Sequence, residues 1–218
     1  MRVLIAVLFM ALLVAPAKAD EPQDLVDRAR LSVESVLRDP NFVAARSRLR
    51  NARGILIVPQ LVKAGFFIGG EGGTGVLLSR DAQGRWSSPA FVSMAGASFG
   101  LQIGVEAKEV LFIIMTEKGM NSLLSPQAKL GADASFSAGP VGMGIEAATT
   151  GSPATDIIAF SKSQGVFGGA ALEGSVIQPK ADFNHAYYGQ PVTPQEILFQ
   201  RTVNQAGADG LRNALAAR

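Results

Sequence analysis

The sequence predicts an α+β fold: a strongly curved, mainly antiparallel, glycine-rich β-sheet or small barrel, flanked by N-terminal and C-terminal helices. Apolar residues recur at helical spacing near both ends of the chain, and alternate with a period of two in between. Of the 24 glycines, 20 fall between Gly65 and Gly174. Glycine weakens a strand unless the strand bends or another backbone packs closely against it, so this enrichment predicts a curved sheet with a tightly packed small-residue face.

The N-terminal part is predicted to contain two helices. The segment Pro22 to Asp39 carries apolar residues at helical spacing, and Pro40 ends it. Asn41 is expected to cap a second, shorter helix that continues to about Asn51.

The central part is predicted to be β-structure. Apolar or alternating runs indicate strands at 55–58, 64–68, 76–79, 97–107, 110–115, 141–147 and 157–160. The glycine-rich segment 69–75 resembles a hairpin connection, and the continuously apolar run 110–115 is typical of a strand buried on both faces. Residues 116–124 and 200–217 are predicted helices.

The first 19 residues are predicted to be a secretory signal peptide. Arg2 precedes the twelve-residue apolar run Val3 to Val14, and Ala17-Lys18-Ala19 forms an A-x-A cleavage pattern. Residues 20–218 are then expected to form a single domain, exported to the periplasm, with no transmembrane span after cleavage.

Composition excludes several kinds of site. The chain has no cysteine and one histidine, which rules out thiolate chemistry and multi-histidine metal sites, and no cofactor is predicted. The chain has 20 Lys and Arg residues and 18 Asp and Glu residues. Removal of Arg2 and Lys18 with the signal peptide leaves a chain with no net charge. The charge balance therefore gives no indication of nucleic-acid binding.

Two motifs resemble enzyme sites. Gly70 to Gly75 matches G-x-G-x-x-G, but a strand follows it in place of the helix that a dinucleotide site needs. Gly96 to Gly100 matches the G-x-S-x-G nucleophile elbow around Ser98, and His185 follows later in the chain. Because the alternation of apolar with small or polar residues continues through Ser98, the simpler interpretation is that this serine lies within a strand. A serine hydrolase centred on Ser98 and His185 is retained as an alternative.

The clearest candidate binding feature is a local basic segment. Residues 40–53 contain four arginines and no acid. On a helix, Arg46, Arg50 and Arg53 lie beside Phe42, a pattern that resembles an interfacial helix at an anionic membrane. These four residues are the predicted lipid-binding site. The other interpretation is a surface helix whose arginines pair with acids elsewhere in the fold.

The segment Gly165 to Ser175 closely resembles the G-L-F-A-G-x-S-L-E-G-S signature of the SYLF domain, also called the Ysc84 actin-binding-protein family. Further stretches that resemble this family are 53–66, 70–77, 100–104 and 187–198. The resemblance covers about residues 24–199 and identifies the chain as a bacterial, secreted member.

The resemblance implies a lipid-binding module without catalytic activity. Eukaryotic relatives bind phosphoinositides through a basic amphipathic N-terminal helix, and some bind actin. The first helix here departs from that pattern because, between Pro22 and Arg38, it balances three acids against three arginines, which are Asp24, Asp27 and Glu34 against Arg28, Arg30 and Arg38. We therefore expect a non-enzymatic domain that binds anionic phospholipid surfaces peripherally in the periplasm. A periplasmic interaction scaffold with no lipid role is the second alternative.

Overall fold

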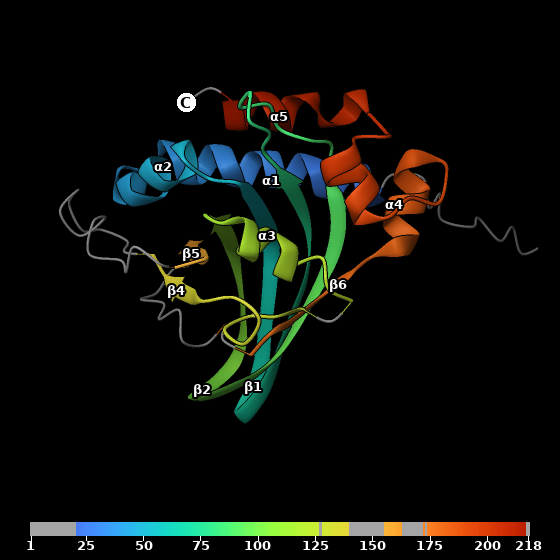
Figure 1. Cartoon of the computed structure of the whole chain (residues 1–218). Coiled ribbons are helices and arrows are strands. Elements are labelled where there is room, and N and C mark those ends of the chain that lie inside the picture. Colours follow the sequence, from blue (N-terminus) through green and yellow to red (C-terminus); the bar gives the residue numbers. More distant parts are fainter. Residues whose placement is uncertain (1–20, 127, 140–154, 163–171, 173, 217–218) are drawn as a thin grey trace, which may run out of the picture.

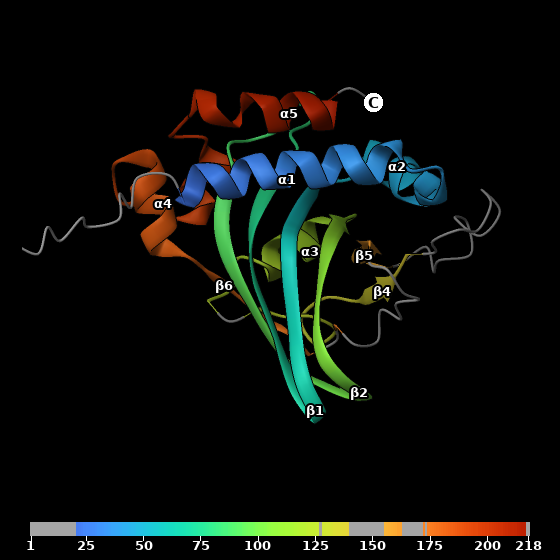
Figure 2. The same cartoon turned by 180° about the vertical axis from the view of Figure 1, so that it is seen from behind.

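The computed structural model describes residues 21–126, 128–139, 155–162, 172 and 174–216 of the 218-residue chain. A long β-hairpin folds over on itself, and helices from both ends of the sequence lie side by side across one end of it (Figures 1 and 2). The predicted α+β class, with a curved sheet flanked by terminal helices, is confirmed. The predicted signal peptide lies outside the described residues.

The N-terminal helices agree with the sequence prediction to within two residues. Helix α1 spans Glu21–Arg38 and buries its apolar stripe, and a 3-10 turn at Pro40–Phe42 leads into α2, Val43–Arg50. Asp39, rather than Asn41, provides the cap, because its side chain accepts a hydrogen bond from the Asn41 N–H. Helix α5, Asp209–Ala216, packs on α1 from the side opposite the sheet.

Two long strands form the centre of the sheet. Strand β1, Gly54–Ser79, pairs antiparallel with β2, Ala90–Ile114, and the register shifts between Val58 and Leu61 and again between Gly65 and Phe67. The prediction that residues 69–75 form a hairpin connection is wrong. This segment lies inside β1, and the connection is instead the turn after Ser79, where Gly84 adopts a φ of 81°.

Shorter strands extend the sheet on both sides of β2. Strand β6, Val176–Pro179, pairs with the first part of β2, whereas β5, Ile157–Lys162, pairs with its last part. Strands β3, Ala128–Lys129, and β4, Phe136–Ala138, complete the order β3-β6-β2-β5-β4, and β1 also pairs with β2. All these pairings are antiparallel except β4 with β5. The predicted strand at 141–147 lies outside the described residues.

Close backbone approach explains the glycines at the end of β1. A Cβ atom at Gly73 would lie 2.7 Å from the Gln60 carbonyl oxygen, and one at Gly75 would lie 2.6 Å from that of Ile57. The two halves of β1 therefore contact each other through positions that have no room for a methyl group. Close packing of strand glycines is therefore observed at Gly73 and Gly75, whereas the predicted strand at 141–147, with its own glycines, lies outside the described residues.

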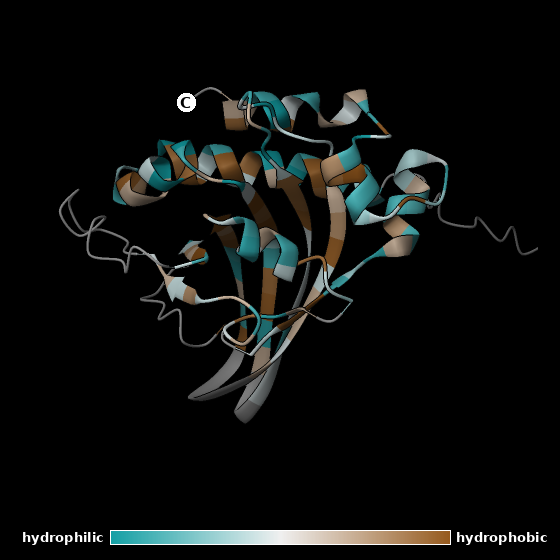
Figure 3. Ribbon diagram, in the orientation of Figure 1, coloured by the Kyte–Doolittle hydropathy of each residue, from teal (hydrophilic) through white to brown (hydrophobic). Residues whose placement is uncertain are grey.

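The part of the sheet that lies nearest the helices is buried on both faces. One apolar cluster joins α1, α2, α4 and α5 to alternate residues of the strands, and a second cluster lies on the opposite face beneath α3. The run Val110–Ile114 contributes to both, and each of its residues is at most 1% exposed, as predicted for a strand covered on both sides. The hydrophobic colouring is strongest where the helices meet the strands (Figure 3).

The remaining helical segments are short. Helix α3, Glu117–Ser122, is capped by the Thr116 hydroxyl, and α4 spans Ala181–Tyr188. A π-helical segment, Glu196–Gln200, ends at Arg201, whose φ of 53° is left-handed, and a 3-10 turn at Ala206–Ala208 precedes α5. The predicted helix over 200–217 is thus too long, because the left-handed Arg201 breaks the helical path.

One ion pair is enclosed within the sheet. The Lys108 Nζ lies 4.0 Å from a Glu71 carboxylate oxygen, and both side chains are fully buried. Burial raises the pKa of Glu71, although Lys108 and a hydrogen bond from Ser175 oppose that shift. These two charges therefore do not contribute to any exposed surface.

Candidate functional site

The structure places two of the four predicted lipid-binding residues away from the free surface. Phe42 is 2% exposed and packs in the core with α1, so it is not available to a membrane. The guanidinium of Arg46 is half-buried and donates hydrogen bonds to the backbone oxygens of Leu37 (3.1 Å) and Asp39 (2.8 Å). Arg46 thereby stabilises the C-terminal end of α1, where unpaired carbonyls carry partial negative charge.

We expect Arg46→Ala to lower the free energy of unfolding by about 1 to 2 kcal/mol, because two backbone carbonyls lose a charged donor. Urea unfolding followed by circular dichroism measures this change. Ser47→Ala, at an exposed position of the same helix, is the control and should change stability by less than about 0.5 kcal/mol. Equal stability of the two variants would show that the Arg46 hydrogen bonds are replaced by water at no cost.

The other two predicted residues, Arg50 and Arg53, are exposed, and the fold brings further arginines to them. Arg80 donates from its guanidinium to the Arg50 carbonyl oxygen at 2.6 Å and from its backbone N–H to the Arg53 carbonyl oxygen at 2.8 Å. The same side chain also bonds to the Gly84 oxygen at 3.1 Å and lies 5.7 Å from the centre of the Trp86 ring. Arg80 therefore fixes the end of α2 against the turn between β1 and β2.

This turn adds Arg85, which is 71% exposed at its side chain. We call Arg50, Arg53, Arg80 and Arg85 the basic ledge. Asp81 is its one paired acid, since its carboxylate lies 2.9 Å from both Arg85 Nε and Arg201 Nη1. Four arginines and one aspartate leave a formal charge of +3 on the ledge, and within the described residues neither Arg50 nor Arg53 forms an ion pair.

Arg50 and Arg53, half of this ledge, are predicted from the sequence. Arg80 and Arg85 were missed because each is an isolated basic residue in a turn, about 30 positions from α2. The available signal was the pair of arginines on either side of the short polar stretch Asp81 to Gly84.

The serine hydrolase alternative finds no support in the local geometry. Ser98 pairs with Gly69 in the interior of β2, which continues to Ile114, whereas a nucleophile elbow requires a helix directly after the serine. His185 is exposed on α4, where it lines a cavity of about 480 Å³ with Asp182 and Thr193. Likewise, no helix follows the glycines at 70–75, so the dinucleotide motif lacks its context.

Two kinds of feature are absent from the described ranges. No His, Asp or Glu side chains gather there in a group of three that could hold a metal ion. None of the helices described has both the length and the apolar character needed to cross a membrane. The fold and its surface thus define a small α+β domain, built on one folded-over hairpin, that presents a ledge of exposed arginines.

Comparison with known proteins identifies the family. The model of the Ysc84 family, described as "Las17-binding protein actin regulator", matches residues 95–218. Protein YSC84 of Saccharomyces cerevisiae is 38% identical over 173 residues, which is 78% of this chain and 37% of the yeast protein. The chain belongs to the Ysc84 family, in agreement with the SYLF resemblance of its sequence.

Other relatives extend the same match. LAS seventeen-binding protein 3 of Saccharomyces cerevisiae is 36% identical over 78% of this chain and 38% of its own length. The human SH3 domain-containing YSC84-like protein 1 is 28% identical over 81% of this chain and 52% of its own length. This chain therefore spans between about a third and a half of the length of these relatives, of which LAS seventeen-binding protein 3 is named for binding another protein.

Proposed function

We propose that this protein is a non-enzymatic domain that binds anionic phospholipid surfaces peripherally, in the periplasm if the predicted signal peptide directs its export. The basic ledge is the observation that carries this proposal. It gathers arginines from α2, from the segment before β1 and from the turn after β1 around the Arg80 hydrogen bonds, with a formal excess of three positive charges.

The contacts of the ledge suit a surface that meets a flat array of phosphates. Arg80 is held by two carbonyl oxygens and the Trp86 ring, so it serves mainly to position its neighbours. Arg50, Arg53 and Arg85 project outward, where each basic side chain near an anionic bilayer contributes about 1 kcal/mol. The ledge has no exposed large apolar residue of its own, so electrostatic attraction dominates and the binding is expected to weaken with salt.

The test is sedimentation with vesicles that contain phosphatidylglycerol in phosphatidylcholine. The double variant Arg50→Gln/Arg53→Gln removes about 2 kcal/mol of attraction, so its affinity should fall roughly 30-fold. The unsubstituted chain should bind these vesicles, bind pure phosphatidylcholine little, and lose affinity as ionic strength rises.

The matched control is Arg28→Gln/Lys129→Gln, which changes the net charge equally at exposed positions on α1 and β3. This control should retain most of the affinity. Equal losses in the two double variants would mean that net charge alone matters, and the ledge would have no special role. Failure of the native chain to bind any anionic vesicle would instead favour the interaction scaffold, consistent with the relatives named for Las17 binding.

A further inference from the structure

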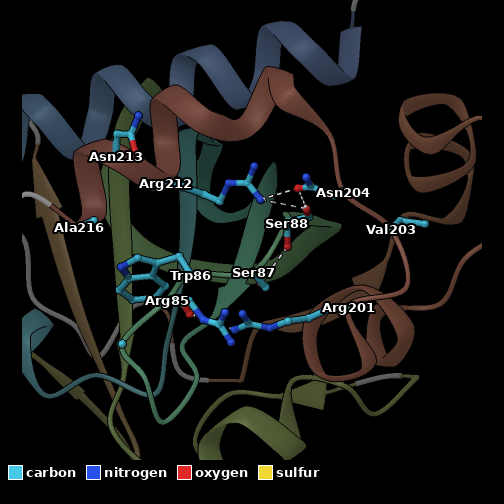
Figure 4. Close-up of a pocket in the computed structure, with 11 residues that line it drawn as sticks. Arg85, Trp86, Ser87, Ser88, Arg201, Val203, Asn204, Arg212, Asn213 and Ala216 are labelled. Atoms are coloured by element: carbon cyan, nitrogen blue, oxygen red, sulfur yellow. Dashed lines mark hydrogen bonds between the residues drawn. The ribbon is translucent and has the colours of Figure 1, made fainter.

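A cavity of about 490 Å³ opens at Arg85, a member of the basic ledge (Figure 4). It lies between the turn at 84–88, the segment 201–204 and the face of α5 that carries Arg212 and Ala216. Three arginines from these three segments line it: Arg85, Arg201 and Arg212. Ser88 lies between Arg212 on one side of the cavity and the Arg85–Arg201 pair on the other.

The guanidinium groups in this cavity are fixed in place. Arg201 donates to the Asp81 carboxylate and to the Arg85 carbonyl oxygen, both at 2.9 Å. Arg212 donates to the Asn204 side-chain oxygen at 2.6 Å and pairs with Asp209. A cation that is already oriented loses little conformational freedom when a ligand binds.

Positive charge is in excess in the cavity, and donors remain available. Arg85 and Arg201 approach the same oxygen of Asp81, so two like charges share a single acid. A guanidinium has five N–H donors, of which the described hydrogen bonds occupy two in Arg201 and one in Arg85. An added anion would relieve this repulsion and use the remaining donors.

The backbone at Arg201 is unusual. Among the described residues it is the one non-glycine with a positive φ, 53°, and it directly follows the π-helical segment Glu196–Gln200. Both features are costly, and both are enriched at functional sites. Here the left-handed turn ends the helical path and places the Arg201 guanidinium against Asp81 at the cavity.

We infer that this cavity binds a phosphate group carried on a small polyol, the headgroup chemistry of an anionic glycerophospholipid. This inference rests on the proposed function and adds to it a specific headgroup site. Guanidinium groups bind phosphate oxygens through paired N–H donors, which Arg85 and Arg201 provide. The cavity exceeds the volume of a phosphate, and the exposed Asn213 side chain lines another part of it, where a polyol hydroxyl can be bound.

The first experiment uses a soluble fragment of the headgroup. Trp86 is the single tryptophan of the chain and lines the cavity, so its fluorescence reports on occupancy. Titration of the full chain with glycerol 3-phosphate should give a saturable change, and glycerol should give none. Arg201→Gln should weaken the affinity roughly tenfold or more, whereas Arg50→Gln/Arg53→Gln should leave it unchanged.

Because Arg201 also contacts Asp81, its replacement could disturb the turn. Arg85→Gln is the second variant: its side chain is mostly exposed, and its loss should weaken glycerol 3-phosphate binding without lowering the melting temperature. Absence of a saturable signal with the native chain, or an affinity equal to that of the native chain in both cavity variants, would overturn the inference. The proposed function would then still stand if the Arg50 and Arg53 pair controls vesicle binding.

The second experiment separates a lipid headgroup from a free phosphate compound. Vesicles with phosphatidylglycerol are compared with vesicles of equal surface charge made with oleate, which carries a carboxylate. The native chain should prefer phosphatidylglycerol, and Arg201→Gln should remove the preference while retaining ledge-dependent binding to both. Glycerol 3-phosphate binding without any vesicle binding would assign the cavity to a soluble phosphate compound, and would overturn both its lipid assignment and the proposed function.

Discussion

Replacing Gly75 with alanine is expected to destabilise the protein by about 3 kcal/mol, at the upper end of the range for overpacking. The added Cβ would lie 2.6 Å from the Ile57 carbonyl oxygen, 2.9 Å from a Val58 methyl carbon and 3.0 Å from a Leu56 methyl carbon. The nearest atom belongs to the backbone, so a change of rotamer cannot relieve the contact. The two halves of β1 would have to separate.

The measurement is thermal unfolding, in which this loss corresponds to a fall in melting temperature of roughly 10 °C. Gly70→Ala on the same strand is the matched control, because its Cβ would meet only the Gly96 oxygen at 3.8 Å. That variant should be as stable as the native chain, or slightly more so, since alanine restricts the unfolded chain. Equal behaviour of the two variants would show that the halves of β1 do not pack as closely as the structure places them.

Replacing Asp156 with alanine should have a comparable effect of about 3 kcal/mol, because it breaks a nearly enclosed hydrogen-bond network. Asp156 is 6% exposed, and its carboxylate accepts from the Thr116 hydroxyl at 2.5 Å and from the Ser135 backbone N–H and hydroxyl at 2.9 and 2.8 Å. Lys118 lies 3.6 Å away. The network ties the start of α3 to the start of β5 and to the residue before β4, so its loss affects three elements.

The same carboxylate predicts a dependence of stability on pH. Burial acts to raise the pKa of Asp156, but the hydrogen bonds from Thr116 and Ser135 and the charge of Lys118 together outweigh it and lower the pKa from 3.8 to about 2. The folded state therefore holds this proton less tightly than the unfolded state does. The stabilisation, about 2 kcal/mol, is fully present above pH 4 and is lost as the pH falls through about 2.

Asp156→Asn isolates the contribution of this carboxylate to the pH dependence of stability, because it keeps the shape of the side chain and removes its titration. Urea unfolding at several pH values between 2 and 5 should show a shallower loss of stability in this variant than in the native chain. Parallel curves for the two proteins would mean that other carboxylates account for the acid sensitivity, and that the Asp156 network contributes little to it.

Local periodicity was sufficient to predict the elements whose environment is uniform along their length. The stripe of Leu25, Val33 and Leu37 predicts the buried face of α1, because residues three or four apart share one side of a helix. The run Val110–Ile114 predicts a strand covered on both faces for an equally direct reason: every side chain there needs an apolar neighbour. The glycine enrichment predicted a curved sheet, and Gly73 and Gly75 show the cause in the contact between the two halves of β1.

The same local signals failed where one composition suits two structures. Glycines at 69–75 are typical of a turn, yet they lie inside a strand because the strand passes close to its own first half. The position of Phe42 relative to the arginines in the sequence is the same whether the side chain faces a membrane or the core. Only the packing of α1 over the sheet places it in the core. Arg46 carries the same charge as Arg50. Its guanidinium, however, is hydrogen-bonded to backbone carbonyls at the end of α1, so it is not exposed as Arg50 is.

By itself, the sequence determined the class of fold, the family resemblance and the arginine pair of α2 and its following turn. The tertiary structure alone decided that Arg80 and Arg85 join that pair, and that Arg201 and Arg212 meet Arg85 around one cavity. The physical reason is distance along the chain. Each of these arginines is an ordinary solvated residue in its own segment, and their combined charge exists only once the hairpin has folded over and α5 has packed on α1.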